Sequence, residues 1–141
     1  MESQRFIVTC KGACEPNPGR GAWAFRRRTF DGKEPHDASG SIGGISTNQR
    51  AELTGILMGL LATPMFSHIT LFSDMRNVVE KINRIAPGEG YFVNADLWVK
   101  IGAAVLDRDV DATWIKKCST EDHSACCKEA FAIATGKSVG P

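Results

Sequence analysis

The sequence predicts a single α/β domain with a five-stranded mixed sheet and helices on both of its faces. Two observations predict this class. β-Prone runs and helical stripes follow one another in the order βββαβα(α)βα, which leaves helices to cover a mixed sheet. The 141 residues are 43% hydrophobic and 23% charged, a composition that can bury a core. Residues 1–141 are therefore expected to form one domain.

The first three segments are predicted to be strands separated by turn-forming residues. Residues 5–10 contain an apolar run that ends at a cluster of glycine, proline and asparagine. Residues 22–28 form a second strand. The turn at Asp31-Gly32 then leads to a third strand, which runs toward residues 39–42 and is expected to end at Gly43-Gly44.

The rest of the chain alternates helices with strands. Asn48 is a candidate helix cap, and apolar residues recur at helical spacing from Leu53 to Leu61. Residues 68–73 are expected to form a buried parallel strand. The remaining predicted elements are helices over residues 73–85, 94–106 and 122–135 and a strand over residues 110–117.

Charge and cysteine content narrow the class of protein. The net charge is only +1, so any surface that binds nucleic acid has to be local. Arg26, Arg27 and Arg28 cannot all share one patch, because alternate residues of a strand face opposite sides. The sequence has no apolar run of the ~20 residues that a membrane span requires and no export signal, which predicts a cytoplasmic protein. Five cysteines cannot all pair, and reduced thiols are expected.

Several segments resemble type 1 ribonuclease H, in the same order and at nearly the same spacing, so that the resemblance covers almost the whole chain. It implies a ribonuclease H-like fold, in which three antiparallel strands are followed by parallel strands. The segments that carry the resemblance are residues 7–23, 47–53, 71–74, 94–98, 113–117 and 127–130.

The same resemblance implies a site in which four carboxylates hold two magnesium ions that hydrolyse a phosphodiester. The four positions fall on Lys11, Glu52, Asp74 and Lys128, so lysine replaces two of the four ligands. Two carboxylates and two ammoniums sum to zero without a metal. We therefore expect a metal-free cluster of ion pairs and no functional catalytic residues at these positions.

The family also carries a catalytic histidine on the loop after the fifth strand, and the matching position here is Cys118. His123 lies five residues later. It could replace the missing histidine or simply be a polar residue at a helix start, and the second interpretation is favoured.

A short cluster of Cys118, His123, Cys126 and Cys127 raises the question of zinc. Adjacent cysteines on a helix point about 100° apart, which opposes convergence of all four side chains on one ion. The sequence therefore predicts no metal site here.

Some positions that contact the substrate in the family are retained. Asn17, Asn48 and Gln49 match residues that, in the family, reach the minor groove and the 2′-hydroxyls of an RNA/DNA hybrid. Asn17 also suits a turn, and Asn48 also suits a helix cap. Arg20 and Arg76 are further candidate contacts. The segment before Asn94 has no room for the basic helical handle that many bacterial relatives insert.

These observations predict a pseudoenzyme that acts by binding an RNA/DNA hybrid, a structured RNA or a protein partner. The alternative is an active, magnesium-dependent nuclease with an altered site, in which Asp122 or Glu129 is recruited as a ligand. The sequence leaves the oligomeric state open.

Overall fold

The computed structural model of the chain describes residues 4–32, 35–85 and 93–136. Its strands are β1 (Arg5–Cys14), β2 (Gly19–Thr29), β3 (His36–Ser46), β4 (His68–Ser73) and β5 (Asp109–Trp114). They form one sheet in the order β3-β2-β1-β4-β5. β1, β2 and β3 pair antiparallel, whereas β4 lies parallel to both β1 and β5. The predicted mixed sheet and its strand directions are confirmed.

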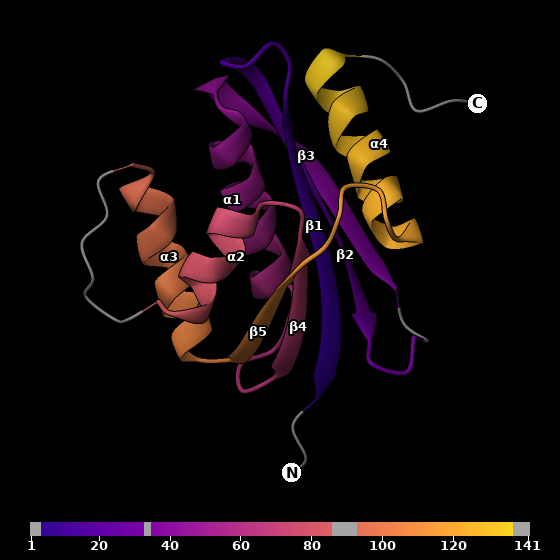
Figure 1. Cartoon of the computed structure of the whole chain (residues 1–141), viewed down its shortest axis with the longest axis vertical. Helices are drawn as coiled ribbons and strands as arrows, with labels where there is room; N and C mark the ends of the chain where they lie inside the picture. Colours follow the sequence, from indigo (N-terminus) through magenta and orange to yellow (C-terminus); the bar gives the residue numbers. More distant parts are fainter. Residues whose placement is uncertain (1–3, 33–34, 86–92, 137–141) are drawn as a thin grey trace.

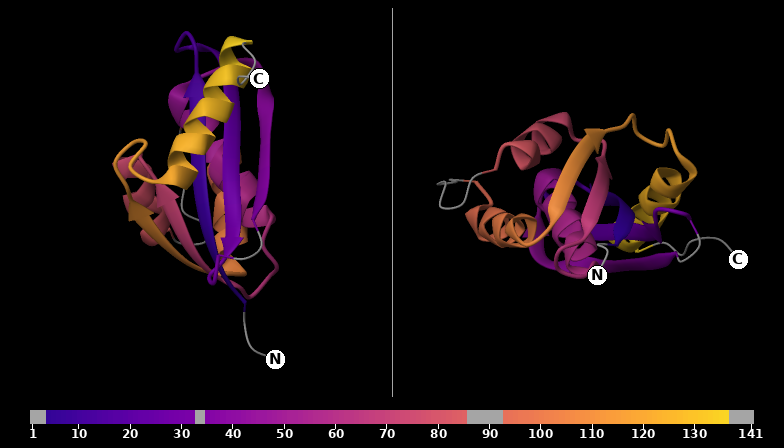
Figure 2. Two further views of the ribbon diagram at one scale, coloured as in Figure 1. Left: turned by 90° about the vertical axis from the view of Figure 1, so that its right-hand side faces the viewer. Right: turned by 90° about the horizontal axis from the view of Figure 1, so that it is seen from below.

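Four helices cover the two faces of this sheet. They are α1 (Asn48–Leu61), α2 (Arg76–Asn83), α3 (Ala95–Leu106) and α4 (Glu121–Thr135). α1, α2 and α3 lie on one face and α4 lies on the other (Figures 1 and 2). Among the described residues, no helix combines the length and the apolar character needed to cross a membrane.

The main core lies between the sheet and α1, α2 and α3. A smaller cluster of Ala24, Cys126 and Ala130 lies under α4. Because α4 buries mostly small side chains, its backbone can approach the sheet closely. The largest fully buried apolar side chains of the main core are Val8, Leu53, Ile56, Leu60, Leu71, Val78, Ile82, Trp98 and Ile101.

Several boundaries differ from the sequence prediction: β1 continues to Cys14 instead of ending at residue 10, β5 ends at Trp114 instead of residue 117, and α2 begins at Arg76 instead of residue 73. Two further differences have identifiable reasons. β3 continues through Gly43-Gly44 to Ser46, because an irregularity in the pairing with β2 absorbs them and Gly44 takes a left-handed φ of 74°. The cap of α1 is Thr47 rather than Asn48, since the Thr47 hydroxyl accepts the Arg50 N–H at 3.1 Å. Asn48 is the first residue of the helix.

Gly12 sets the distance between β1 and α1. A Cβ at this position would lie 2.1 Å from the backbone nitrogen of Glu52 and 2.2 Å from the carbonyl carbon of Ala51. Only glycine allows the two backbones to come this close. The contact brings the first turns of α1 directly against β1, where the candidate site lies.

Candidate functional site

Glu52 lies in the interior at the junction of β1, α1 and β4, with no exposed surface. Its carboxylate accepts the Gly12 N–H at 2.7 Å and the Ser73 hydroxyl at 3.0 Å. Burial raises the pKa of Glu52 to about 7, although Lys11 and these two hydrogen bonds favour the ionised form. Glu52 therefore changes its charge near neutral pH.

Lys11 and Asp74 form an ion pair beside Glu52. The Lys11 Nζ lies 3.1 Å from the Asp74 Oδ2 and 3.4 Å from the Oδ1, and both side chains are about one-tenth exposed. Burial opposes the charge of Lys11, but the carboxylates of Glu52 and Asp74 outweigh it and raise the pKa of Lys11 above its ordinary value. The predicted contact of Lys11 with the site carboxylates is present in the structure.

His123 reaches the same carboxylate from α4. The side chain is fully buried, and its Nε2 lies 3.8 Å from the Asp74 Oδ2. Its Nδ1 accepts the Cys118 backbone N–H at 2.9 Å. Burial lowers the pKa of His123, which favours the neutral ring. A neutral ring that accepts at Nδ1 carries its proton on Nε2, and this N–H faces Asp74 without a hydrogen-bond partner in the described part of the chain.

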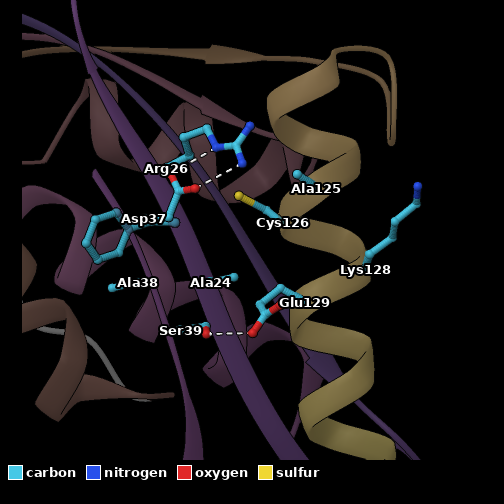
Figure 3. Close-up of a pocket in the computed structure, with 10 residues that line it drawn as sticks. Ala24, Arg26, Asp37, Ala38, Ser39, Ala125, Cys126, Lys128 and Glu129 are labelled. Carbon is cyan, nitrogen blue, oxygen red and sulfur yellow. Dashed lines mark hydrogen bonds and ion pairs between the residues drawn. The ribbon is translucent and has the colours of Figure 1, made fainter. Parts of the chain in front are cut away.

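Lys128 does not join this cluster, which corrects the sequence-based prediction. Its side chain is exposed and projects away from the sheet (Figure 3). Within the described residues, Lys128 makes no ion pair with Glu52 or Asp74. It lies on the helix five positions after His123, or about 140° around the axis. The side chains that α4 presents at the site are those of His123 and Cys127.

The charge balance changes accordingly. One ammonium, that of Lys11, faces the carboxylates of Asp74 and Glu52. The raised pKa of Glu52 lowers the negative charge that a second lysine would otherwise have to balance. The predicted cluster of two lysines and two carboxylates is thus wrong in its composition. Near-neutrality without a metal ion is still reached, through a single lysine and a carboxyl group that can hold its proton.

Cys118 and Cys127 lie beside His123. The two sulfur atoms are 3.5 Å apart, and the Cys127 Sγ lies 3.4 Å from the His123 Nδ1. Cys126 points elsewhere, toward the Thr9 carbonyl oxygen at 3.7 Å. Burial raises the pKa of Cys127 to about 12. Three of the four residues considered for zinc therefore converge, and Cys126 does not.

The candidate nucleic-acid contacts lie around the cluster at different distances. The Asn17 side chain accepts the Asn48 N–H at 3.1 Å, which joins the β1–β2 turn to the start of α1. Arg76 stacks over Trp114 at 4.1 Å, close to Asp74, whose carbonyl oxygen accepts the Trp114 Nε1–H. Gln49 is half-buried on α1, next to Asn48.

Arg20 lies farther from the site than the other candidates. A Cβ at Gly136 would lie 3.2 Å from the Arg20 guanidinium, which places Arg20 at the C-terminal end of α4. His123 lies at the N-terminal end of the same helix. The two positions are about 20 Å apart along the helix. Asn17, Arg20, Asn48 and Arg76 are all exposed, so each is accessible to a ligand.

The arginine cluster on β2 divides as the strand period predicts. Arg26 and Arg28 both bind the Asp122 carboxylate, at 3.0 and 2.9 Å. Arg27 lies on the opposite face, with its guanidinium over the Phe6 ring. Because Asp122 already pairs with two arginines, it is not available as a metal ligand at the site.

A cavity of about 450 Å³ lies between α4 and the strands β2 and β3 (Figure 3). Glu129 lines it and accepts a hydrogen bond from the Ser39 hydroxyl at 3.1 Å. Glu129 is thus directed toward β3 rather than toward Asp74. None of the residues that line the cavity belongs to the Lys11, Glu52, Asp74 and His123 cluster.

Comparisons with known proteins agree with the architecture and the resemblance. The RNase H family model matches residues 3–129. The ribonuclease H of Anaplasma marginale is 27% identical over 147 residues, covering 97% of this chain and 92% of the relative. The ribonuclease H of Xanthomonas euvesicatoria pv. vesicatoria is 32% identical over 123 residues, covering 79% and 80%.

Solved structures give the same result for the fold. The N-terminal RNase H domain of a Mycobacterium tuberculosis protein superposes with a TM-score of 0.79 at 19% identity, over 95% of this chain and 96% of that one. LC11-RNase H1, solved in complex with an RNA/DNA hybrid, gives a TM-score of 0.74 at 16% identity, over 93% and 97%.

Proposed function

Because the chain belongs to the ribonuclease H family, we propose that it binds RNA/DNA hybrid without cleaving it. The observation that carries this proposal is the Lys11 ammonium, which lies 3.1 Å from the Asp74 carboxylate at a position where the resemblance implies a metal ligand. A cation in this place competes with a metal ion for the same carboxylate. Lysine in place of a carboxylate at position 11 removes one metal ligand and adds a positive charge that repels the ion.

The donors around Asp74 do not fit magnesium. Magnesium requires near-octahedral coordination by oxygen, and it gives up its own waters reluctantly. Here the neighbours of Asp74 are an ammonium, an imidazole and, beyond it, a thiol. The Glu52 carboxylate already accepts from Gly12 and Ser73. We therefore assign no hydrolytic step to this site.

Binding is supported by the groups that remain exposed. Asn17 and Asn48 lie together at the start of α1, and Arg76 lies beside the Asp74 backbone. Amides can contact 2′-hydroxyls, and an arginine can neutralise a phosphate. A relative with the same fold, LC11-RNase H1, has been solved with an RNA/DNA hybrid.

Cleavage by an altered site is the second candidate function. The retained carboxylates of Glu52 and Asp74, together with His123 at 3.8 Å from Asp74, favour it. Asp122 and Glu129 are not available as additional metal ligands. The Asp122 carboxylate binds Arg26 and Arg28, and the Glu129 carboxylate binds Ser39.

A cleavage assay on a labelled hybrid separates the two functions. We expect no turnover above a buffer blank with either magnesium or manganese. The matched variants are Glu52→Gln and Asp74→Asn, which remove one site carboxylate each. Turnover by the unaltered protein that disappears in both variants would overturn the proposal and establish the nuclease.

Binding is tested by a titration at several salt concentrations. A few phosphate contacts predict a slope of log K against log salt of about −2 to −4, at about −0.9 per phosphate on a B-form duplex. Arg76→Ala should reduce the magnitude of the slope by about 1. Arg84→Ala, which removes an exposed arginine at the other end of α2, should leave the slope unchanged. Hybrid should bind more tightly than a DNA duplex.

Failure to bind hybrid, duplex or single strand at low salt would reject nucleic acid as the partner. The protein-partner alternative would then remain. An equal loss of slope in Arg76→Ala and Arg84→Ala would assign the binding to net charge rather than to the groups around Asp74.

A further inference from the structure

We propose that Cys118, His123 and Cys127 form a zinc site with two thiolate ligands, one imidazole ligand and an open fourth position for water. No part of this inference depends on whether the protein cleaves or binds nucleic acid. Its basis is the convergence of three ligand atoms that the chain brings together from the loop after β5 and from the first two turns of α4.

The distances between the ligand atoms agree with a tetrahedral zinc ion. With Zn–S about 2.3 Å and Zn–N about 2.0–2.1 Å, two bound sulfurs are about 3.8 Å apart, and a bound sulfur and nitrogen are about 3.6 Å apart. The Cys118 and Cys127 sulfurs are 3.5 Å apart, and the Cys127 Sγ lies 3.4 Å from the His123 Nδ1. All three ligand atoms lie within 4.8 Å of one another. The Cys118–Cys127 and Cys127–His123 pairs need movements of only a few tenths of an ångström, and Cys118 must in addition turn its sulfur toward the His123 Nδ1.

The spacing of the three residues explains this convergence. His123 and Cys127 are four positions apart on α4, so their side chains share one face of the helix. Cys118 is brought back to them by a left-handed backbone φ of 59°, and its N–H bonds to the His123 Nδ1. Metal binding at Nδ1 would release this N–H, and the exposed Cys118 loop can make the necessary adjustment.

The surroundings of His123 suit a zinc ligand. When Nδ1 binds a metal, the neutral ring must carry its proton on Nε2, which is the tautomer already required by the Cys118 N–H. This buried Nε2 has no hydrogen-bond partner in the described part of the chain and lies 3.8 Å from the Asp74 carboxylate. A carboxylate behind a ligating histidine fixes its orientation and raises its basicity. Asp74 is positioned for this role.

Charge favours zinc over a hard cation at this place. Binding releases one proton from each of the two thiols, and the two thiolates then neutralise the divalent ion. The resulting unit adds no net charge beside the Lys11–Asp74 ion pair. Thiolate and imidazole ligands select zinc or a similar metal over magnesium. The fourth position opens toward solvent, because Cys118 is exposed.

The test is zinc binding by the full chain, purified with a phosphine reductant so that thiols stay reduced. The protein is loaded with zinc, dialysed against a weak chelator and measured by elemental analysis. A second sample is loaded with cobalt, because thiolate-bound tetrahedral cobalt gives intense visible bands. We expect one zinc per chain and a tetrahedral cobalt spectrum.

Matched cysteine variants locate the ion. Cys118→Ser and Cys127→Ser should each abolish stoichiometric retention, whereas Cys126→Ser should retain one zinc, because the Cys126 thiol faces Thr9 instead. Since Cys118 is exposed, Cys118→Ser should fold normally, and circular dichroism checks this. Asp74→Asn should keep the site but weaken zinc binding by about 10–100-fold.

Three results would overturn the proposal. One is less than a tenth of an equivalent of zinc on the reduced, folded protein. Another is equal retention in Cys118→Ser and Cys126→Ser. The third is a protein that fails to take up zinc when reduced and joins Cys118 to Cys127 when exposed to air, with the loss of two hydrogens. That outcome would replace the metal site by a redox-active pair of thiols.

Discussion

Helices α1 and α4 pack against β1 from opposite faces of the sheet, and each brings a different kind of group to the neighbourhood of Asp74 (Figure 2). From α1 comes Glu52, a buried carboxylate held by Gly12 and Ser73. From α4 come His123 and Cys127, a neutral imidazole and a thiol. One helix offers hard oxygen atoms and the other offers nitrogen and sulfur.

The difference shows how charge is arranged around one carboxylate. On the α1 side, the Lys11 ammonium compensates the negative charge of Asp74 and of Glu52. On the α4 side, the groups next to Asp74 carry no charge while burial lowers the pKa of His123. A change of charge should therefore be costly on the α1 side. On the outer surface of α4 it should have little effect.

The largest expected effect follows from Lys11→Asp. This change leaves three carboxylates together without an ammonium, in a place where both partners of the ion pair are about one-tenth exposed. Breaking such a pair should lower the free energy of unfolding by about 3–5 kcal/mol in the presence of chelator. Magnesium should recover part of this loss, about 2.7 kcal/mol at 100 times its dissociation constant. Urea unfolding with and without magnesium measures both effects.

Lys128→Asp is the matched control for the same reversal of charge. Because Lys128 is exposed on α4, its replacement should change the free energy of unfolding by less than about 0.5 kcal/mol, with no response to magnesium. If Lys128→Asp proved as destabilising as Lys11→Asp, the placement of Lys128 outside the Lys11, Glu52 and Asp74 cluster would be wrong.

A smaller effect is expected from Glu52→Gln, as a change in pH dependence. The pKa of Glu52 is raised from 4.5 to about 7 in the folded state, so between these values the unfolded chain loses a proton that the folded chain keeps. Stability therefore falls as the pH rises through this window, by up to about 3 kcal/mol for this fully buried group. Glu52→Gln should remove this fall.

The measurement is the free energy of unfolding of both proteins at several pH values from 4.5 to 8. His123 acts in the opposite sense, because its lowered pKa reduces stability as the pH falls below its ordinary value near 6.5. The difference between the two proteins isolates Glu52. A difference that stays constant across the pH range would show that Glu52 ionises in the folded state as it does in the unfolded chain.

The smallest expected effects on stability come from the N-terminal caps of α1 and α4. The Thr47 hydroxyl accepts the Arg50 N–H at the start of α1, and the Thr120 hydroxyl accepts the His123 N–H at the start of α4. Thr47→Ala and Thr120→Ala should each lower the free energy of unfolding by about 1 kcal/mol. Only Thr120→Ala should also speed the reaction of Cys118 with a thiol reagent, since it loosens the turn that holds His123. Equal rates in both variants would contradict this link.

The α1 side of the site could be predicted from the sequence more fully than the α4 side. Glu52 and Asp74 are indicated by the resemblance of residues 47–53 and 71–74 to ribonuclease H, and the structure brings both beside Lys11. Ser73 as a partner of Glu52 was missed, because a hydroxyl at the end of a strand gives no pattern of its own.

The register of α4 could not be predicted from the short match at residues 127–130. That match placed a lysine at the site, although the helix turns Lys128 outward. A better signal is present in the helical period, because four of the five buried residues of α4 follow the spacing of one helix face. These four are His123, Cys126, Ala130 and Ala134, and Ala132 is the fifth buried residue. A fully apolar stripe is easily recognised, but the histidine at its start favours the interpretation as a polar residue at a helix start, whereas His123 is fully buried.

The contact at Gly12 separates the shape of this site from its chemistry. Backbone atoms of β1 and α1 meet there, so the side chains around them do not set the spacing of the two elements. The residue at position 11 can then change from one charge to the opposite without moving Glu52. By the same reasoning, position 12 admits no substitution, since even alanine would push α1 away from β1. A scaffold built in this way can exchange one reactive group for another over evolutionary time and still present it at the same point.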